Sequence, residues 1–215
     1  MNSRAKGVRG ERQWRDELRA HGYEARRGQQ FSGSPDSPDV VCPALPWAHF
    51  EVKLVERLNV YDAMDQARRD SGGRAAFLSH RRNHWPWLVT MDPERLYRLL
   101  HVDETGGWAE RMAGVAPSVA LAGFASWLHC VVLTKPRNVQ EAMAEVGREA
   151  CQLNRTAAVV AHERPGKPAL ITMRAETFFQ FLCGSLPPEG TGAVRQEQNQ
   201  NNKQKSYIQT YESST

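Results

Sequence analysis

The sequence predicts an α/β fold, because short segments with the two-residue period of strands alternate with segments of helical period. Residues 10–22 are expected to form the first helix. Trp14 and Leu18 share one face of it with Glu11, and Gly22 ends it. The strands that follow are expected to form a central sheet flanked by helices.

The remaining elements of the first half follow in order along the chain. A loop rich in Ser, Gly and Pro precedes Asp39, and Ser71-Gly72-Gly73 ends a later helix. The expected strands cover residues 23–31, 39–42, 49–55, 74–80 and 87–91. The expected helices after the first cover residues 60–70 and 93–100.

The second half of the chain resembles the first. NVYDAMDQARRD at residues 59–70 resembles NVQEAMAEVGRE at residues 138–149. Residues 75–100 align without a gap on residues 157–182, so the copies are about 80 residues apart. The alternative is two generic helix–strand–strand–helix units that share a hydrophobic pattern. Identities at polar positions favour a true duplication.

This repeat divides the chain into three parts. The first domain is expected over residues 1–102 and a second copy over residues 103–187. Residues 188–215 form a polar tail rich in Gln and Asn, which lacks the aliphatic residues needed for a core and is expected to be disordered.

Extending the alignment backwards predicts which polar residues the second copy has lost. It places Ser118 opposite Asp39, and it aligns residues 50–55 with residues 129–134. Glu51 then corresponds to Cys130, and Lys53 corresponds to Val132. The second copy is therefore expected to be folded but catalytically empty.

The charge of the chain is uneven and positive. The net charge is +4 and the isoelectric point is about 9.0. Basic residues gather in residues 1–30 and again in residues 80–84. Such clusters favour a polyphosphate partner such as a nucleic acid. A generally soluble basic surface is the alternative.

Other features exclude several classes of protein. The four cysteines lie far apart with no CxxC pair, which argues against a zinc ribbon and fits reduced thiols. The longest apolar stretch is too short and too polar to span a membrane, and no secretory leader is recognised. No Walker loop, HExxH or GxSxG motif is present. We expect a cytoplasmic protein of a bacterial, archaeal or phage-infected cell, without a membrane partner.

Two short motifs bring together the residues that a hydrolytic metal site requires. Glu51 and Lys53 are two residues apart on one expected strand, so their side chains point to the same face. Asp39 opens the preceding short strand, whereas Asp36 lies in the loop and is interpreted as a turn residue. Carboxylates that converge from rigid elements bind Mg²⁺, and a nearby ammonium can orient the attacking water.

These residues resemble the PD-(D/E)xK nuclease superfamily, in which Pro-Asp and Glu-x-Lys lie on adjacent strands. Within it, residues 4–92 are most similar to the Holliday-junction resolvases of archaea and phages. The similarity extends to Gly7-Val8-Arg9-Gly10-Glu11-Arg12, to Arg26-Arg27 and to the Ser-Gly loop before Pro-Asp. The resemblance implies a restriction-endonuclease-like, resolvase-like core with a mixed sheet.

The resemblance also implies roles for individual residues. Glu11, Asp39 and Glu51 would be ligands of Mg²⁺, with Mn²⁺ as a substitute. Lys53 would position or activate the water, and Gln66 would orient the site. The residues expected to contact DNA are Arg9, Arg12, Arg26, Arg27, Ser32, Arg81 and Arg82.

The activity implied is that of a metal-dependent endodeoxyribonuclease that cuts four-way junctions in recombination or repair. Cleavage of duplex, flap or other branched DNA, or of RNA, stays open as an alternative, as does non-catalytic DNA binding with a relic site. Relatives of this kind act as symmetric dimers. The second copy leaves open a homodimer or an intramolecular pseudo-dimer.

Overall fold

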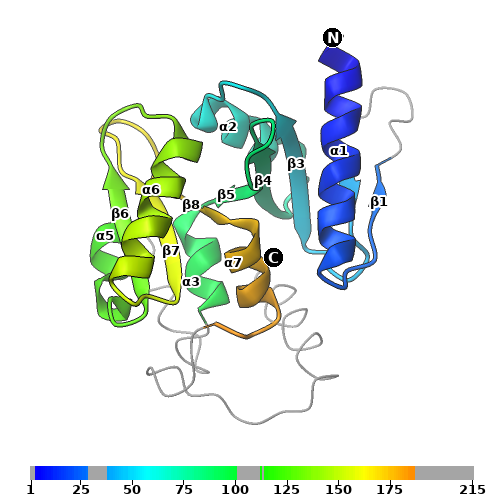
Figure 1. Ribbon diagram of the computed structural model, residues 1–215. Helices are drawn as coiled ribbons and strands as arrows, with labels where there is room; N and C mark the ends of the chain where they lie inside the picture. The colour runs from blue at the N-terminus through cyan, green and yellow to red at the C-terminus, as the bar shows by residue number, and fades with distance from the viewer. Residues whose placement is uncertain (1–2, 29–37, 101–111, 113, 187–215) are drawn as a thin grey trace. The chain divides into compact units, whose positions relative to one another are not determined.

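The computed structural model describes residues 3–28, 38–100, 112 and 114–186, and it confirms an α/β fold (Figure 1). Residues up to 85 form one compact unit, and residues 86–186 belong to another. In the part of the chain described, no helix is long and apolar enough to cross a membrane. The predicted domain boundary at residues 102/103, the whole of the predicted tail and Ser32 fall outside the described residues.

The first unit is a four-stranded mixed sheet with two helices. Its strands are β1 (Arg26–Arg27), β2 (Val40–Val41), β3 (Ala48–Leu54) and β4 (Ala75–Arg81), in that order across the sheet. Its helices are α1 (Ser3–Ala20) and α2 (Val60–Asp70). The β1–β2 and β2–β3 pairs are antiparallel, whereas β3 and β4 are parallel and are joined through α2.

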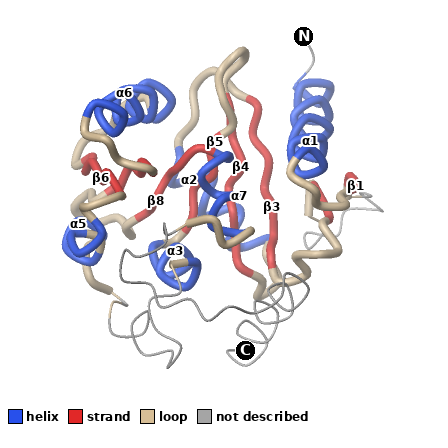
Figure 2. The backbone as a smooth tube through the Cα atoms, turned by 60° about the horizontal axis from the view of Figure 1, so that its bottom comes forward, coloured by secondary structure: helices blue, strands red, loops and turns tan. Residues whose placement is uncertain are grey.

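Helix α1 lies alongside β3 and closes the core of the first unit (Figure 2). Trp14 and Leu18 are fully buried, as their helical spacing predicts, and the Trp14 ring lies 5.7 Å from that of Phe50. Gly10 permits this close approach, because a Cβ there would lie 3.0 Å from the Cβ of Leu54. The helix therefore fixes one face of β3, and the odd-numbered residues of β3 are left to the other face.

The second unit contains a sheet in the order β5-β8-β7-β6. Its strands are β5 (Leu88–Met91), β6 (Leu128–Leu133), β7 (Ala157–His162) and β8 (Leu170–Arg174). Its helical elements are α3 (Pro93–Leu99), α5 (Pro117–Ala120), η1 (Ala122–Phe124), α6 (Val139–Gln152) and α7 (Ala175–Leu182). Strands β6 and β7 are parallel, and β8 is antiparallel to both of its neighbours.

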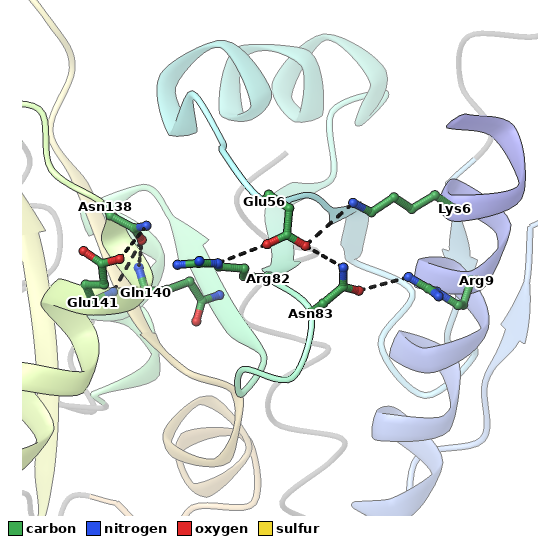
Figure 3. Close-up of polar contacts among 8 residues, drawn as sticks. All are labelled: Lys6, Arg9, Glu56, Arg82, Asn83, Asn138, Gln140 and Glu141. Carbon is green, nitrogen blue, oxygen red and sulfur yellow. Dashed lines mark hydrogen bonds and ion pairs between the residues drawn. The ribbon is translucent and has the colours of Figure 1, made fainter. Parts of the chain in front are cut away.

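Helix α6 packs on this sheet through an apolar stripe. Val139, Ala142, Met143 and Val146 form a buried cluster with strand residues of the same unit. The Oδ1 of Asn138 caps the helix by accepting from the backbone N–H of residue 140 at 3.0 Å (Figure 3). The sequence pattern predicted this helix, since its apolar residues recur at helical spacing.

Several sequence predictions differ from the structure. The first helix, expected over residues 10–22, begins seven residues earlier and spans Ser3–Ala20. The strand expected over residues 23–31 is, among the described residues, only Arg26–Arg27, because β2 offers only two residues for pairing. Ser118, which the alignment placed opposite Asp39, lies in the short helix α5 and does not precede a strand. The other elements expected between residues 39 and 100 are confirmed to within one or two residues at each end.

Candidate active site

Asp39, Glu51 and Lys53 are brought together by the antiparallel pairing of β2 with β3. Asp39 stands immediately before β2, and its Oδ2 accepts a hydrogen bond from the backbone N–H of Val52 at 2.8 Å. This bond holds the carboxylate beside the middle of β3. Glu51 and Lys53 project from β3 on one face, and Lys53 Nζ lies 2.6 Å from Glu51 Oε1. The Glu51 side chain is only 7% exposed, so this is a largely desolvated pair.

Helix α2 supplies a second partner for the lysine. Lys53 Nζ donates to Gln66 Oε1 at 2.9 Å, and Gln66 Nε2 in turn donates to Asp70 Oδ2 at 3.4 Å. Gln66 was predicted to orient the site, but the sequence analysis did not single out Asp70. The signal that points to it is its spacing, because residues four apart on a helix face each other. The ammonium is thus held between a strand carboxylate and a helix amide.

The site carries an excess of negative charge. Burial, followed by the charge of Glu51, raises the pKa of Asp39 from 3.8 to about 7. Glu11 raises this pKa further, whereas the Val52 N–H and Lys53 act in the opposite direction. One ammonium therefore does not offset the two carboxylates whose charges act on Asp39. A functional site is a common reason for a carboxyl perturbed in this way.

The raised pKa of Asp39 predicts a specific pH dependence of stability. Between about pH 4 and pH 7 the folded protein keeps a proton that the unfolded chain has released, so stability falls as the pH rises through this window. Asp39→Asn keeps the hydrogen bond to Val52 and removes the titration. We compare the free energies of unfolding of the variant and the wild type in chelator. Their difference should shift by about 2–4 kcal/mol in favour of the variant as the pH rises from about 4 to about 8.

Urea denaturation at the two ends of this range measures the difference. Asp16→Asn is the matched control, because Asp16 is exposed on α1 and pairs with Arg15 at 2.6 Å. The control should change the free energy of unfolding much less than Asp39→Asn does, because it removes one exposed ion pair. An Asp39→Asn variant whose stability follows the wild type at every pH would contradict the shift.

Glu11 reaches the same region from α1. Its side chain is 13% exposed, and Arg27 of β1 donates to its Oε2 from both Nε, at 2.8 Å, and an Nη atom, at 2.7 Å. Arg27 was predicted to contact DNA, and in the structure it holds this carboxylate. Glu11 is thus a third carboxylate whose charge is partly balanced within the first unit.

No ready-made cage of ligands for a metal is present in the part of the chain described. Among residues 3–28, 38–100, 112 and 114–186, no group of three or more His, Cys, Asp or Glu side chains is arranged to hold a metal ion. Two of the predicted ligands have basic partners, because Arg27 pairs with Glu11 and Lys53 pairs with Glu51.

Gly28 is a further residue on which the site depends, and the sequence analysis did not identify it. Its backbone N–H donates to the carbonyl of Asp39 at 2.9 Å. A Cβ at this position would lie 1.8 Å from the carbonyl oxygen of Pro38. Only glycine allows β1 to approach the Pro-Asp segment this closely. The sequence carries no local signal for this contact, because Gly28 and Pro38 are ten positions apart.

The predicted DNA-contacting residues of the first unit gather partly around Glu56, which follows β3 (Figure 3). Glu56 accepts from Arg82 at 3.0 Å and from Asn83 at 2.5 Å, and Lys6 lies 3.9 Å away. Asn83 also accepts from Arg9 at 2.9 Å. The cluster joins the start of α1 to the turn that follows β4. Its cations outnumber its single carboxylate, so it remains a basic surface.

The other predicted DNA contacts lie elsewhere in the first unit. Arg12 on α1 and Arg26 on β1 are exposed, and Arg81 is half-buried at the end of β4. The Arg82 guanidinium also lies over the ring of Trp85, 5.7 Å from its centroid. Exposed arginines on neighbouring elements are suited to contacts with phosphates.

The register of the second unit corrects the alignment of its β6 strand by one residue. Ala48 pairs with Ala75 in the first unit, and Leu128 pairs with Ala157 in the second. Residues 51 and 53 therefore correspond to Val131 and Leu133, and not to Cys130 and Val132 as the sequence alignment had it. Val131 and Leu133 pack into the apolar cluster with α6.

Comparisons with known proteins give a weak structural likeness. No protein family matches the sequence. No curated protein matches it either. A similar solved structure is that of Hjc from Archaeoglobus fulgidus, a Holliday junction resolvase from an archaeal hyperthermophile. The two chains are 27% identical over 39% of this chain and 70% of that chain, with a TM-score of 0.30.

Proposed function

We propose that this chain is a divalent-metal-dependent endonuclease that hydrolyses phosphodiester bonds in DNA. The observation that carries the proposal is the convergence of Asp39, Glu51 and Lys53 at the β2–β3 pair, with Gln66 holding the lysine. Two largely desolvated carboxylates beside one ammonium are costly for stability, and ionisable groups perturbed in this way cluster at functional sites.

The residues present fit a hard divalent cation. Mg²⁺ prefers oxygen ligands and is commonly held by one or two carboxylates together with substrate phosphates, so a complete cage of protein ligands is not required. Asp39 and Glu51 would provide the two carboxylates, and Glu11 is close enough for its charge to act on Asp39. The same donors suit Mn²⁺.

A bound dication supplies charge to neutralise the phosphoryl oxygens and lowers the pKa of a bound water. The chain's own residues supply position. Lys53, with Nζ held by Glu51 and Gln66, presents an ammonium of fixed direction that can orient a water or stabilise the developing negative charge. Asp39 is fixed by the backbone of β3, so the carboxylates keep their separation as substrate binds.

Branched DNA, with the four-way junction as its first example, is the substrate class that we propose. The support is the sequence resemblance of residues 7–12, 26–39 and 51–53 to junction resolvases, together with the basic surface around Glu56. Arginines that contact phosphates orient a nucleic acid without reading its sequence, so selectivity would rest on DNA shape.

Cleavage of labelled DNA tests the substrate class. A four-way junction and a linear duplex of matching sequence are incubated with the protein, with Mg²⁺ and with chelator. Cutting of the junction alone, and only with Mg²⁺, is expected. Equal cutting of both DNAs would overturn the junction as substrate and leave the nuclease. Tight binding of the junction without any cutting would favour a non-catalytic DNA-binding protein.

A further inference from the structure

The two halves of the chain share backbone details that a generic hydrophobic pattern would not produce. Ala75 N donates to Trp47 O at 2.8 Å, and Ala157 N donates to Trp127 O at 3.1 Å. The turn after β4 and the turn after β7 also match, since the N–H groups of residues 85 and 167 both donate to the carbonyl three positions back at 3.1 Å.

The same equivalence holds for residues of unusual conformation. His84 and Gly166 occupy matching places in these turns, and both have positive φ, 63° and 71°. A positive φ is uncommon for a residue other than glycine. Side chains agree as well. Asn59, which precedes α2, donates to Asp62, and Asn138, which precedes α6, donates to Glu141. These matches indicate that the halves are copies of one supersecondary unit.

Strands β5 and β8 are the equivalent fourth strands of these copies, and they pair with each other. Thr90 faces Thr172, and their hydroxyl oxygens are 2.7 Å apart. These two threonines are themselves equivalent residues, 82 positions apart, in the ungapped alignment of the copies. Val89 pairs with Met173 and Met91 pairs with Ile171, so the register is the same when read from either strand.

In a two-fold interface, whenever residue i of one copy contacts residue j of the other, residue j of the first copy contacts residue i of the second. The β5–β8 pairing has this symmetry. Such an interface normally joins two identical chains. Here both strands belong to one chain, and β8 has β5 on one edge and β7 on the other. The edge of β8 is therefore closed to a second copy.

Only one of the two copies keeps the charged residues of the candidate site. In the first, β3 carries Glu51 and Lys53, whereas Val131 and Leu133 of β6 are packed against α6. A histidine and an acidic residue stand at equivalent positions beside the site in both copies. His49 lies within electrostatic reach of Asp70, and His129 Nε2 is 3.0 Å from Glu149 Oε2.

We propose that the β5–β8 pairing replaces, within one chain, the interface of a two-fold dimer, and that the protein is a monomer that makes one cut in each bound DNA. The pairing is independent of the proposed function, whereas the single cut rests on it. The product would be a nick with its partner strand intact.

Two measurements on the full chain test the pairing without reference to activity. Sedimentation should give the 24.2 kDa of one chain at assay concentrations. Under oxidising conditions, Thr90→Cys alone should give no more crosslinked dimer than the wild type, because residue 90 faces residue 172. The Thr90→Cys, Thr172→Cys double variant should form a disulfide within one chain. A stable species of twice the chain mass, or efficient crosslinking of Thr90→Cys chains to each other, would overturn the pairing.

A supercoiled plasmid that extrudes a cruciform tests the number of cuts. Nicked circles should accumulate and persist, because a nick relaxes the plasmid and the cruciform is reabsorbed before a second cut. Linear DNA formed directly from supercoiled DNA would overturn the single cut. If no DNA is cut while the mass stays that of one chain and residue 90 does not crosslink, the proposed function fails and the pairing stands.

Discussion

Replacing Lys53 by methionine is expected to lower the rate of DNA cleavage by at least about 10²-fold. The ammonium is the group held by both Glu51 and Gln66, and methionine fills a similar length without charge or donors. Single-turnover cleavage of a labelled junction at saturating protein measures the rate. Binding of the junction in chelator should change much less, because one lysine is a small part of the basic surface.

The control for this variant is Lys135→Met, which removes an exposed lysine of the second unit. It should cleave at the rate of the wild type. Circular dichroism of both variants checks that they fold. Cleavage by Lys53→Met at the rate of the Lys135→Met control would remove the lysine from the site.

Replacing Gly28 by alanine is expected to cause the second large loss, on the order of 10²-fold in cleavage rate, without removing any polar group. The added Cβ would lie 1.8 Å from the Pro38 carbonyl oxygen, so β1 or the Pro-Asp segment must move. That movement displaces Asp39 from the Val52 N–H. Such overpacking should also cost about 1–3 kcal/mol of stability.

Gly7→Ala is the matched control for Gly28→Ala. A Cβ at Gly7 would meet no atom closer than Glu11 Oε1 at 4.0 Å, and alanine favours a helix by about 1 kcal/mol over glycine. This control should keep full activity and equal or greater stability. Thermal unfolding and cleavage of the two variants side by side would decide the matter, and an active, fully stable Gly28→Ala protein would contradict the close approach.

Much of the first unit could be predicted from the sequence, since its signals are local. The burial of Trp14 and Leu18 follows from helical spacing, and the common face of Glu51 and Lys53 follows from strand geometry. The preference for Asp39 over Asp36 came from the strand that follows it. Asp39 indeed binds the backbone of β3, whereas Asp36 lies outside the described residues.

Contacts between segments distant in the sequence could not be predicted in the same way. The ion pair of Arg27 with Glu11 and the close approach of Gly28 to Pro38 both depend on how β1 packs against its neighbours. The alignment of the second copy failed by one residue for another reason. A run of Val and Leu fits either register, yet a shift of one residue turns every side chain to the opposite face.

The position of helix α6 relative to β6 explains that error. Equivalent residues of helices α2 and α6 are 79 positions apart, whereas equivalent residues of strands β3 and β6 are 80 positions apart. The connection between strand and helix is therefore one residue shorter in the second copy. An alignment anchored on the helix therefore misplaces the strand. The conclusion that the second copy lacks the charged residues is unchanged, but the residues in their place are Val131 and Leu133.

The central claim is that Asp39 belongs to a metal-dependent hydrolytic site, and one measurement tests it most directly. Cleavage of a labelled four-way junction is followed for the wild type, Asp39→Asn and Asp36→Asn, each with Mg²⁺ and with chelator. We predict Mg²⁺-dependent cutting by the wild type and by Asp36→Asn, and a loss of at least about 10²-fold in Asp39→Asn. Cutting by Asp39→Asn at the wild-type rate, or cutting that persists in chelator, would contradict the account.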